Sequence, residues 1–314
     1  MIHRSLSVVF IVFIVILISS ICKEADSDTA VKTVFSPKRV LMEPHQLKEN
    51  FSNWIILDAR PVKYWEKSHI SGAISFSWEN YTTIDSNNIP YRVLSPEQMA
   101  EALGKLGISA ESMILIYGDA DKSWGGEGWG FWLFAWLGHK GEVGLLKGGI
   151  QAWERSKFDL TGRAKESLDK DRPVESKKKQ SIQPVRYIPN PVPSINISAR
   201  EIHDNPDKYQ LVDTRSTIEW FKGHLPDAVH IPWEKFFKGR DRSPLNAEEL
   251  KSLLNKNGLN MEKTVVYYCT GGIRSGYAWM VHELAALKLR ELPETINFEG
   301  GTAEWEAVNN LNGL

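Results

Sequence analysis

The chain has 314 residues, a formal net charge of −1 and a pI of ≈ 6.7. This length allows two ordinary domains, and the balanced charge argues against a nucleic-acid-binding protein that relies on a basic surface. The 12 Trp residues are an unusually large number and predict aromatic-lined cores or an aromatic cleft.

The N-terminus differs from the rest of the chain. A short basic start precedes the apolar residues 6–21, and a polar stretch begins at Lys23. This pattern predicts a signal peptide or a membrane anchor over residues 1–22, although the apolar run is slightly short for a spanning helix of ~20 residues. We expect export, most simply to the periplasm. Cleavage before Lys23, lipidation of Cys22 and retention as an anchor all stay open.

The first half, residues 37–160, alternates apolar strands with helices. An apolar run ends in Asp58-Ala59-Arg60, a helix and a strand follow, and the run 114–117 ends at Gly118. Strands that alternate with helices predict an α/β fold with a parallel sheet covered on both faces.

A glycine-rich segment, residues 122–130, leads from Gly118 into a tryptophan-rich helix. Trp129, Trp132 and Trp136 have i, i+3, i+7 spacing, which predicts a helical stripe that faces the core. Trp124 precedes this stripe, and both a place in the lining of a cleft and a simple loop position stay open.

Residues 161–194 are rich in Lys, Asp and Pro and predict an exposed linker, part of it stiffened by proline. The lysine run 177–179 inside it is expected to be a solvated stretch rather than a binding site for an anionic partner.

The second half, residues 195–314, repeats the first. Asp58 matches Asp213 at an offset of 155, and Gly148 matches Gly300 at an offset of 152. Motifs that recur in the same order at a nearly constant offset indicate a tandem duplication of one domain.

The two halves differ at the end of one strand. The run 264–268 predicts a buried strand that ends on Cys269, whereas Gly118 takes this place in the first half. The loop after Cys269 contains two glycines, ends near a helix N-terminus and carries Arg274. Each of these features favours the thiolate, which is the reactive form of cysteine.

The length of this loop separates two kinds of chemistry. Four residues lie between Cys269 and Arg274. Cysteine phosphatases use a loop one residue longer, and in that register this chain has Ser275 instead of arginine. A tighter ring of amides suits a smaller anion, such as a sulfur carried on the cysteine. Outside the N-terminal segment Cys269 is the only cysteine.

Four motifs recur in order in both halves: an Asp-x-Arg strand end, a turn with His-Leu-Pro-x-Ala or its variant, a loop after the central strand, and Gly-Gly-x-x-x-Trp. With the cysteine in the second copy, this series resembles the tandem-domain rhodanese family of sulfurtransferases. The resemblance covers residue 37 to the C-terminus apart from the linker. It implies two α/β domains, each around a parallel five-stranded sheet with helices on both faces, and an active site between them.

The resemblance also implies roles for individual residues. Cys269 is expected to be the catalytic nucleophile and to carry a persulfide. Arg215 matches an arginine that contacts the anionic donor in family members. The loop residues that would hold the sulfur or donor are Thr270, Gly271, Gly272, Ile273 and Arg274. We expect no metal and no cofactor.

The expected reaction moves a sulfane sulfur from thiosulfate or 3-mercaptopyruvate to cyanide or a thiol. The loop interior Thr270-Gly271-Gly272 matches neither the basic nor the Gly-Ser/Thr-Gly type, so the donor stays open. A non-enzymatic persulfide carrier for an exported partner is the main alternative, and a phosphatase or arsenate reductase is disfavoured by the short loop. We expect small-molecule partners, no nucleic acid, and membrane contact only through residues 6–21. Oligomeric state is not predicted.

Other polar residues have structural interpretations. Asp58 and Asp213 are expected to pin the backbone at their strand ends, with Arg60 in an ion pair. His69 recurs at His224 although the first half has no nucleophile, so a structural role is expected for both.

Overall fold

The computed structural model describes residues 40–119, 122–162 and 183–312. The signal or anchor predicted over residues 1–22 and the lysine run 177–179 lie outside these ranges. Within them, no helix combines the length and the apolar character that crossing a membrane requires.

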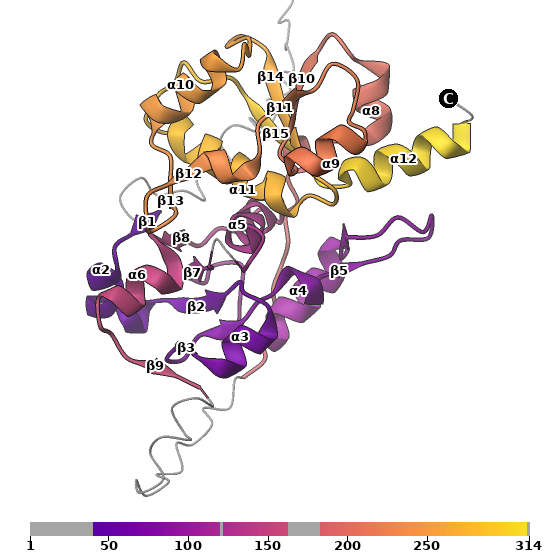
Figure 1. Cartoon of the computed structure of the whole chain (residues 1–314). Coiled ribbons are helices and arrows are strands. Elements are labelled where there is room, and N and C mark those ends of the chain that lie inside the picture. The colour runs from indigo at the N-terminus through magenta and orange to yellow at the C-terminus, as the bar shows by residue number, and fades with distance from the viewer. Residues whose placement is uncertain (1–39, 120–121, 163–182, 313–314) are drawn as a thin grey trace, which may run out of the picture.

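The first half is built on a five-stranded parallel sheet (Figure 1). One face packs against α4 (Pro96–Lys105) and α5 (Gly126–Trp136), and the other against α2 (Pro44–Glu49) and α6 (Gly149–Arg155). The strands in spatial order are β1 (Leu41–Met42), β8 (Val143–Leu146), β7 (Ile114–Tyr117), β2 (Ile55–Asp58) and β4 (Ile74–Ser75).

The second half repeats this arrangement. Its sheet packs against α10 (Ala247–Lys256) and α11 (Ile273–Ala286) on one face, and against α8 (Ala199–Asp204) and α12 (Gly301–Asn312) on the other. The strands in spatial order are β11 (Val229–His230), β10 (Tyr209–Asp213), β14 (Thr264–Tyr268) and β15 (Thr295–Phe298). The expected α/β fold with two tandem domains is confirmed.

The second sheet has four strands, so the expectation of five in each half needs correction. The place of the fifth strand holds only a parallel bridge between Asn196 and Asn297. The short 3-10 helix η3 (Pro193–Ile195) precedes this bridge. Because η3 ends at Ile195 and Ser198 already caps α8, only Asn196 and Ile197 remain between the two helical segments, which is too few for a longer paired strand.

The remaining elements are short. They are the helices α3 (Val62–Lys67) and α9 (Thr217–Lys222), the 3-10 helices η1 (Phe51–Asn53), η2 (Trp78–Asn80) and η4 (Trp233–Phe236), and three antiparallel pairs: β3 (His69–Ile70) with β9 (Leu160–Thr161), β5 (Thr82–Thr83) with β6 (Arg92–Val93), and β12 (Phe237–Lys238) with β13 (Ser243–Pro244).

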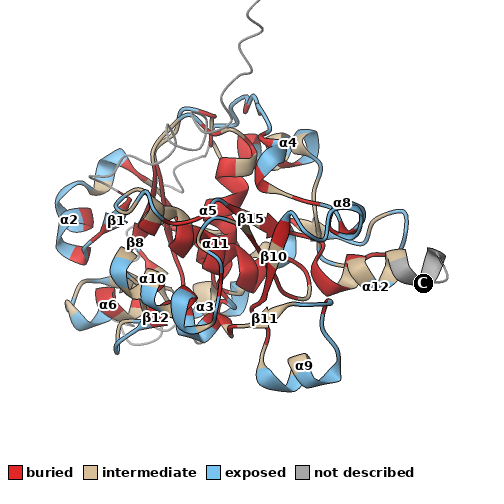
Figure 2. Ribbon diagram, turned by 90° about the horizontal axis from the view of Figure 1, so that it is seen from above, coloured by how far each residue is buried: buried red, intermediate tan, exposed pale blue. Residues whose placement is uncertain are grey.

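Helices α5 and α11 cross at the centre of the molecule, where buried residues concentrate (Figure 2). At Gly128 an added Cβ would overlap the Cα of Tyr277, and at Gly276 it would lie 3.0 Å from the Cα of Trp129. The predicted stripe is confirmed for Trp129 and Trp132, which are buried. However, α5 is buried on all sides from Gly126 to Ala135. One face of α5 packs on the sheet of the first half, and α11 of the second half covers the opposite face.

Two hairpins connect the halves, because each hairpin forms ion pairs with residues of the other half. From the β5–β6 pair of the first half, Arg92 reaches Glu299 at 2.9 Å and Glu304 at 2.5 Å, and the Val93 N–H donates to Glu299 Oε1 at 2.6 Å. In the second half, Asp241 in the turn between β12 and β13 pairs with Arg155 of α6. Each hairpin therefore contacts the turn or helix that follows the last strand, in chain order, of the parallel sheet in the other half.

The described part of the linker packs against the first half instead of standing free. The N–H groups of Val185, Asn190 and Val192 donate to carbonyls of the first half, and Tyr187 is buried against His139. The domain boundaries at residues 160 and 195 stay predictions.

Replacing Gly128 with alanine is expected to lower the free energy of unfolding by about 1–3 kcal/mol, because the new methyl group meets main-chain atoms of α11. This loss outweighs the helix propensity that alanine adds, which is about 1 kcal/mol. Urea unfolding measures the change. Gly130→Ala is the control, since its nearest neighbour is the flexible end of Ile116. An unfolding midpoint for Gly128→Ala at or above that of the unaltered protein would contradict the close crossing.

Glu299, which pairs with Arg92 across the two halves, is expected to make the free energy of unfolding depend on pH. Burial raises the pKa of its carboxyl to about 7, against the opposing effect of Arg92. Because its folded-state pKa lies above the ordinary value, the contribution of Glu299 to the free energy of unfolding is fully present below about pH 4.5 and is lost as pH rises through about 7. Glu299→Gln is expected to flatten this slope in urea titrations at several pH values, and the exposed control Glu248→Gln is not. Equal slopes for the two variants would refute the assignment.

Candidate active site

Cys269 lies where β14, the strand between β10 and β15, ends. Its side chain is only 2% exposed, and the Ser275 hydroxyl lies 3.7 Å from Sγ in hydrogen-bonding geometry. The Cys269 carbonyl accepts from the Thr302 N–H at 2.9 Å, which ties the strand end to the start of α12. The sulfur is thus held at the edge where the carboxyl ends of the parallel strands meet, the usual position of ligands in such sheets.

The loop after Cys269 is compact and confined. An added Cβ on Gly271 would overlap Tyr91 of the first half, and one on Gly272 would lie 2.7 Å from the Glu299 carbonyl. Gly272 has φ +81° and precedes α11, a conformation that glycine adopts without strain. Within residues 40–119, 122–162 and 183–312, no acceptor takes up the N–H groups of Thr270, Gly271 or Gly272. These three amides are available for an anion next to the sulfur.

Arg274 closes the loop through a carboxylate on another element. Its guanidinium makes two bonds of 2.7 Å to the Glu219 oxygens and one of 3.1 Å to Thr270 Oγ1. It also lies over the Trp124 ring at 5.7 Å. Burial disfavours its charge, but the bonds to Glu219 and the neighbouring Cys269 outweigh burial and raise the pKa of Arg274. A permanent positive charge is therefore fixed beside the thiol.

Glu219 is a site residue that the sequence interpretation missed. It is the third residue of α9, and its carboxylate accepts from the N–H and hydroxyl of Ser216 in a capping box. Bonds from Arg274 lower the pKa of this carboxyl well below its ordinary range. The Ser-x-x-Glu spacing reveals the cap, but nothing local reveals the pairing with Arg274, which lies 55 residues further along the chain.

Arg215 lies in a different environment from Arg274. Its guanidinium bonds both oxygens of Asp213, at 3.0 Å and 2.6 Å, and the Gly223 carbonyl at 2.6 Å. Arg60 makes the equivalent bonds to Asp58 and to a carbonyl in the first half, which has no cysteine. The shared geometry indicates that these arginines hold their own turns. A contact between Arg215 and the donor stays a prediction.

The structural interpretations of the other polar residues are confirmed. Asp58 and Asp213 each accept from a main-chain N–H two residues on, at 3.0 and 2.9 Å. His69 stacks on Trp65 and bonds its carbonyl, and His224 does the same with Trp220.

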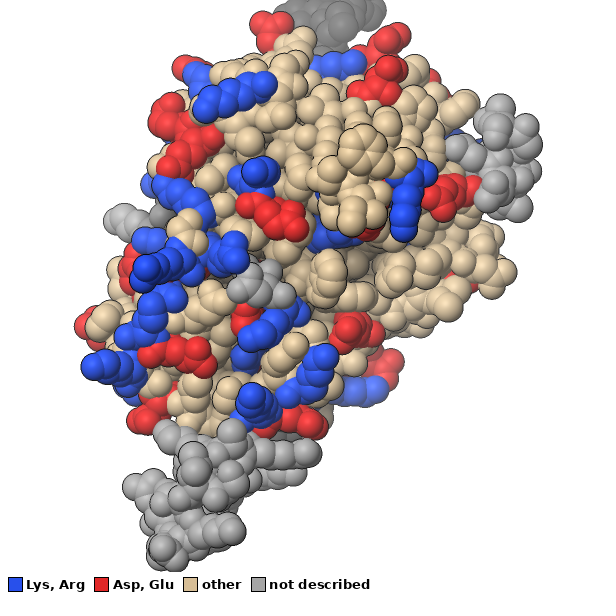
Figure 3. Space-filling model, viewed as in Figure 1, with Lys and Arg blue, Asp and Glu red and all other residues tan. Residues whose placement is uncertain are grey.

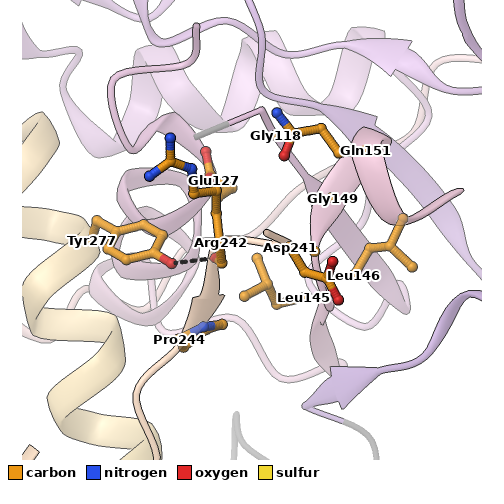
Figure 4. A pocket seen from close by; sticks show the side chains of 11 residues that line it. Gly118, Glu127, Leu145, Leu146, Gly149, Gln151, Asp241, Arg242, Pro244 and Tyr277 are labelled. Atoms are coloured by element: carbon orange, nitrogen blue, oxygen red, sulfur yellow. Dashed lines mark hydrogen bonds between the residues drawn. The ribbon is translucent and has the colours of Figure 1, made fainter. Parts of the chain in front are cut away.

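The matching strand end in the first half is occupied by a carboxyl group. A Cβ on Gly118 would overlap Glu127 Oε2, which accepts from the Ser123 hydroxyl at 2.6 Å. Burial raises the pKa of Glu127. Figure 4 shows residues of both halves converging here, with the Tyr277 hydroxyl bonded to the Arg242 carbonyl. The remaining cavity of ≈ 20 Å³ has room for about one water molecule.

In the part of the chain that is described, no group of three or more His, Cys, Asp or Glu side chains is arranged to hold a metal ion. The polar groups that the structure places around the Cys269 sulfur or its loop include the Ser275 hydroxyl and the Glu219–Arg274 pair.

Comparisons with known proteins agree with this geometry. The family model "Rhodanese-like domain" matches residues 43–156 and 198–308. The sulfur carrier protein TtuD of Thermus thermophilus is 28% identical over 278 residues, which cover 81% of this chain and 86% of the relative. A Mycobacterium tuberculosis protein named as thiosulfate sulfurtransferase SseA is 29% identical over 263 residues, 80% of this chain and 81% of the relative.

Solved structures share the fold at lower identity. The 3-mercaptopyruvate sulfotransferase SseA of Escherichia coli superposes with a TM-score of 0.66 at 19% identity, over 84% of this chain and 98% of that one. The anaerobic ergothioneine biosynthesis enzyme of Chlorobium limicola superposes with a TM-score of 0.68 at 18% identity, over 85% and 68%. With both halves matched by the family model and the cysteine loop in the second, the chain belongs to the rhodanese-like family and carries two copies of its domain.

Proposed function

We propose that this protein is a thiosulfate sulfurtransferase that works through a persulfide on Cys269. The main support is the buried Cys269 at a strand end, followed by three loop amides without an acceptor among the described residues and by Arg274, whose pKa its neighbour Cys269 helps to raise. Relatives that are named as thiosulfate sulfurtransferases and cover about four fifths of the chain support the same reaction class.

In the first half-reaction, the Cys269 thiolate attacks the outer sulfur of thiosulfate. The S–S bond of the donor breaks, sulfite leaves with its electron pair, and the enzyme keeps the sulfur as a persulfide anion. The amides of Thr270, Gly271 and Gly272 stabilise this anion, and Arg274 offsets the negative charge that accumulates during the attack. In the second half-reaction a nucleophilic acceptor takes the outer sulfur, and Cys269 leaves as a thiolate.

The donor stays open between thiosulfate and 3-mercaptopyruvate. Thiosulfate is favoured here because the fixed cation Arg274 and the small loop suit a compact anion. Rates with the two donors at matched concentration, with cyanide as acceptor, decide between them.

A persulfide carrier is the second candidate, because a relative covering 81% of the chain is named a sulfur carrier protein. We also propose that the chain is exported, on the basis of the apolar residues 6–21. Export would remove the protein from cytosolic thiols. A carrier would form the persulfide with thiosulfate but release it to cyanide at a negligible rate.

Cys269→Ala is expected to abolish thiocyanate formation from thiosulfate and cyanide, because the described residues contain no other cysteine that could carry the sulfur. Mass spectrometry of the unaltered protein with thiosulfate should show one added sulfur, and initial-rate plots should give parallel lines. Thr295→Ser is the control variant, because it removes only a methyl group and keeps the buried hydroxyl that donates to the Val265 carbonyl at 3.2 Å. Full activity of Cys269→Ala would sink the proposed reaction.

Glu219→Gln is expected to lower kcat/KM for thiosulfate about tenfold, because Arg274 loses its two-point bond and its fixed position. The pKa of Glu219 is depressed, so its contribution is fully present above about pH 5 and is lost only at lower pH. The pH profile between 5 and 8 should therefore keep its shape in the variant. Glu248→Gln, at an exposed position, serves as control. An unchanged kcat/KM for Glu219→Gln would show that Glu219 does not position Arg274 for the reaction.

A further inference from the structure

Ser275 is a buried polar residue to which the proposed reaction gives no role. Its side chain is 0% exposed, and its hydroxyl donates to Cys269 Sγ at 3.7 Å. Among the residues that the structure describes, the sulfur is the partner of this hydroxyl, and no other group bonds it. Buried hydroxyl groups normally have a hydrogen-bond partner, and here that partner is the reactive atom.

Arg274 also neighbours the sulfur, but it is shared with a carboxylate. Two of its bonds go to Glu219, whose negative charge offsets part of its effect on the thiolate. The Ser275 hydroxyl has no such competing acceptor. It is therefore a donor that is committed to Cys269 Sγ.

The first turn of α11 fixes the position of this hydroxyl. Ser275 is the third residue of α11 and directly precedes Gly276, the residue at the crossing with α5. An added Cβ at Gly276 would lie 3.0 Å from the Cα of Trp129, so this turn is packed against main-chain atoms of the first half. The donor thus belongs to a packed helix, which holds its distance to the sulfur.

The equivalent helix position in the first half also reaches a strand end. Gly128 of α5 and Gly276 of α11 each lie against the residue that follows the glycine of the other helix, so these two positions are equivalent. The residues that precede them, Glu127 and Ser275, are then equivalent as well. This helix position therefore faces the end of the central strand in both copies.

The two copies place different groups at this position. In the first half, the Glu127 carboxyl fills the volume next to Gly118, where no sulfur is present. In the second half, a smaller side chain leaves room for Cys269 and directs an O–H donor at its sulfur. A carboxylate in that place would repel the thiolate, whereas a hydroxyl stabilises it.

We propose that Ser275 is a catalytic residue that stabilises Cys269 as the leaving group when the outer sulfur passes to the acceptor. This inference rests on the proposed persulfide chemistry of Cys269. The acceptor forms a bond to the outer sulfur, the S–S bond to Sγ breaks, and Sγ takes the electron pair. Ser275 keeps its proton and donates a hydrogen bond to the thiolate that forms, so no oxidant or reductant is needed.

The hydrogen bond acts differently on the two half-reactions. During discharge of the persulfide the negative charge on Sγ grows, so the bond from Ser275 strengthens toward the transition state and lowers the barrier. During persulfide formation the charge on Sγ decreases. The bond then makes the thiolate more abundant but less nucleophilic, and these two effects oppose each other. Ser275 is therefore expected to accelerate discharge selectively.

Surface charge affects the encounter with small anions but is separate from this effect. In Figure 3, lysine and arginine side chains gather over the lower part of the face shown, which is where the first half lies in Figure 1. Such a distribution favours the approach of thiosulfate and cyanide. Ser275 is uncharged and fully buried, so its replacement leaves this field unchanged.

Single-turnover measurements separate the two steps. In Ser275→Ala, discharge of the persulfide to cyanide is expected to slow about tenfold, because a hydrogen bond to a charged group is lost. Persulfide formation from thiosulfate is expected to change less than about twofold, because the two opposing effects largely cancel. Ser275→Thr keeps the hydroxyl and is expected to discharge within about threefold of the unaltered protein.

Thr295→Val is the matched control for Ser275→Ala. It removes a buried hydroxyl from the same sheet, at the amino ends of the strands and so at the edge opposite to Cys269. Both half-reactions are expected to keep their rates in this variant.

A mixed disulfide tests the leaving group apart from sulfur transfer. Methyl methanethiosulfonate converts Cys269 to its methyl disulfide and releases methanesulfinate. The thiolate of 2-mercaptoethanol then attacks the methylthio sulfur, and Cys269 leaves as a thiolate. Mass spectrometry of the peptide that contains Cys269 follows the release, which Ser275→Ala is expected to slow about tenfold.

Equal slowing of both half-reactions in Ser275→Ala, or unchanged rates of persulfide discharge and methyl disulfide release, would overturn the assignment. A Ser275→Thr variant that forms the persulfide normally but discharges it as slowly as Ser275→Ala would overturn it as well. If the unaltered protein formed no persulfide with thiosulfate, the proposed function would fail instead, and release of the methyl disulfide would still decide the role of Ser275.

Discussion

The close crossing of α5 and α11 is the constraint on which the rest of the structure depends. Gly128 and Gly276 let the two helices meet at main-chain distance, so the face of each half that would otherwise be solvated becomes interior. This is why the apolar core runs through both halves. It also places the N-terminal end of α11, with Arg274, beside the loop of the first half that carries Trp124. The contact between Arg274 and Trp124 is therefore a consequence of the helix crossing.

The cysteine loop depends on residues from three directions. Glu219 reaches it from α9, Glu299 from the end of β15, and Tyr91 from the first half. One carboxylate, Glu219, both caps a helix and orients Arg274, so the order of a short helix and the position of the reactive charge are coupled. The crosswise hairpin clasps add to this coupling, because Arg92 holds Glu299 directly behind the loop.

Local pattern and internal repetition were enough to predict the α/β fold, the duplication, the strand that ends on Cys269 and the structural roles of Asp58 and His69. The features that escaped prediction are long-range. Glu219 meets Arg274 across 55 residues, and Arg92 meets Glu304 across 212. The second sheet has one strand fewer because η3 and α8 leave only two residues between them, which depends on the exact ends of two short helices. The tryptophan stripe predicted that α5 packs against its own sheet. It did not predict the contact with α11, because α5 is buried on all sides and its sequence shows no polar face to contrast with the buried one.

The carboxyl group at the strand end of the first half limits how the two copies could exchange roles. Glu127 occupies the volume that a side chain at position 118 would need, and the Ser123 hydroxyl donates to it. A cysteine introduced at position 118 could therefore be seated only if the Glu127 carboxylate moved away from Ser123. Transplanting the nucleophile from one copy to the other thus requires a rearranged carboxylate as well as the substitution itself.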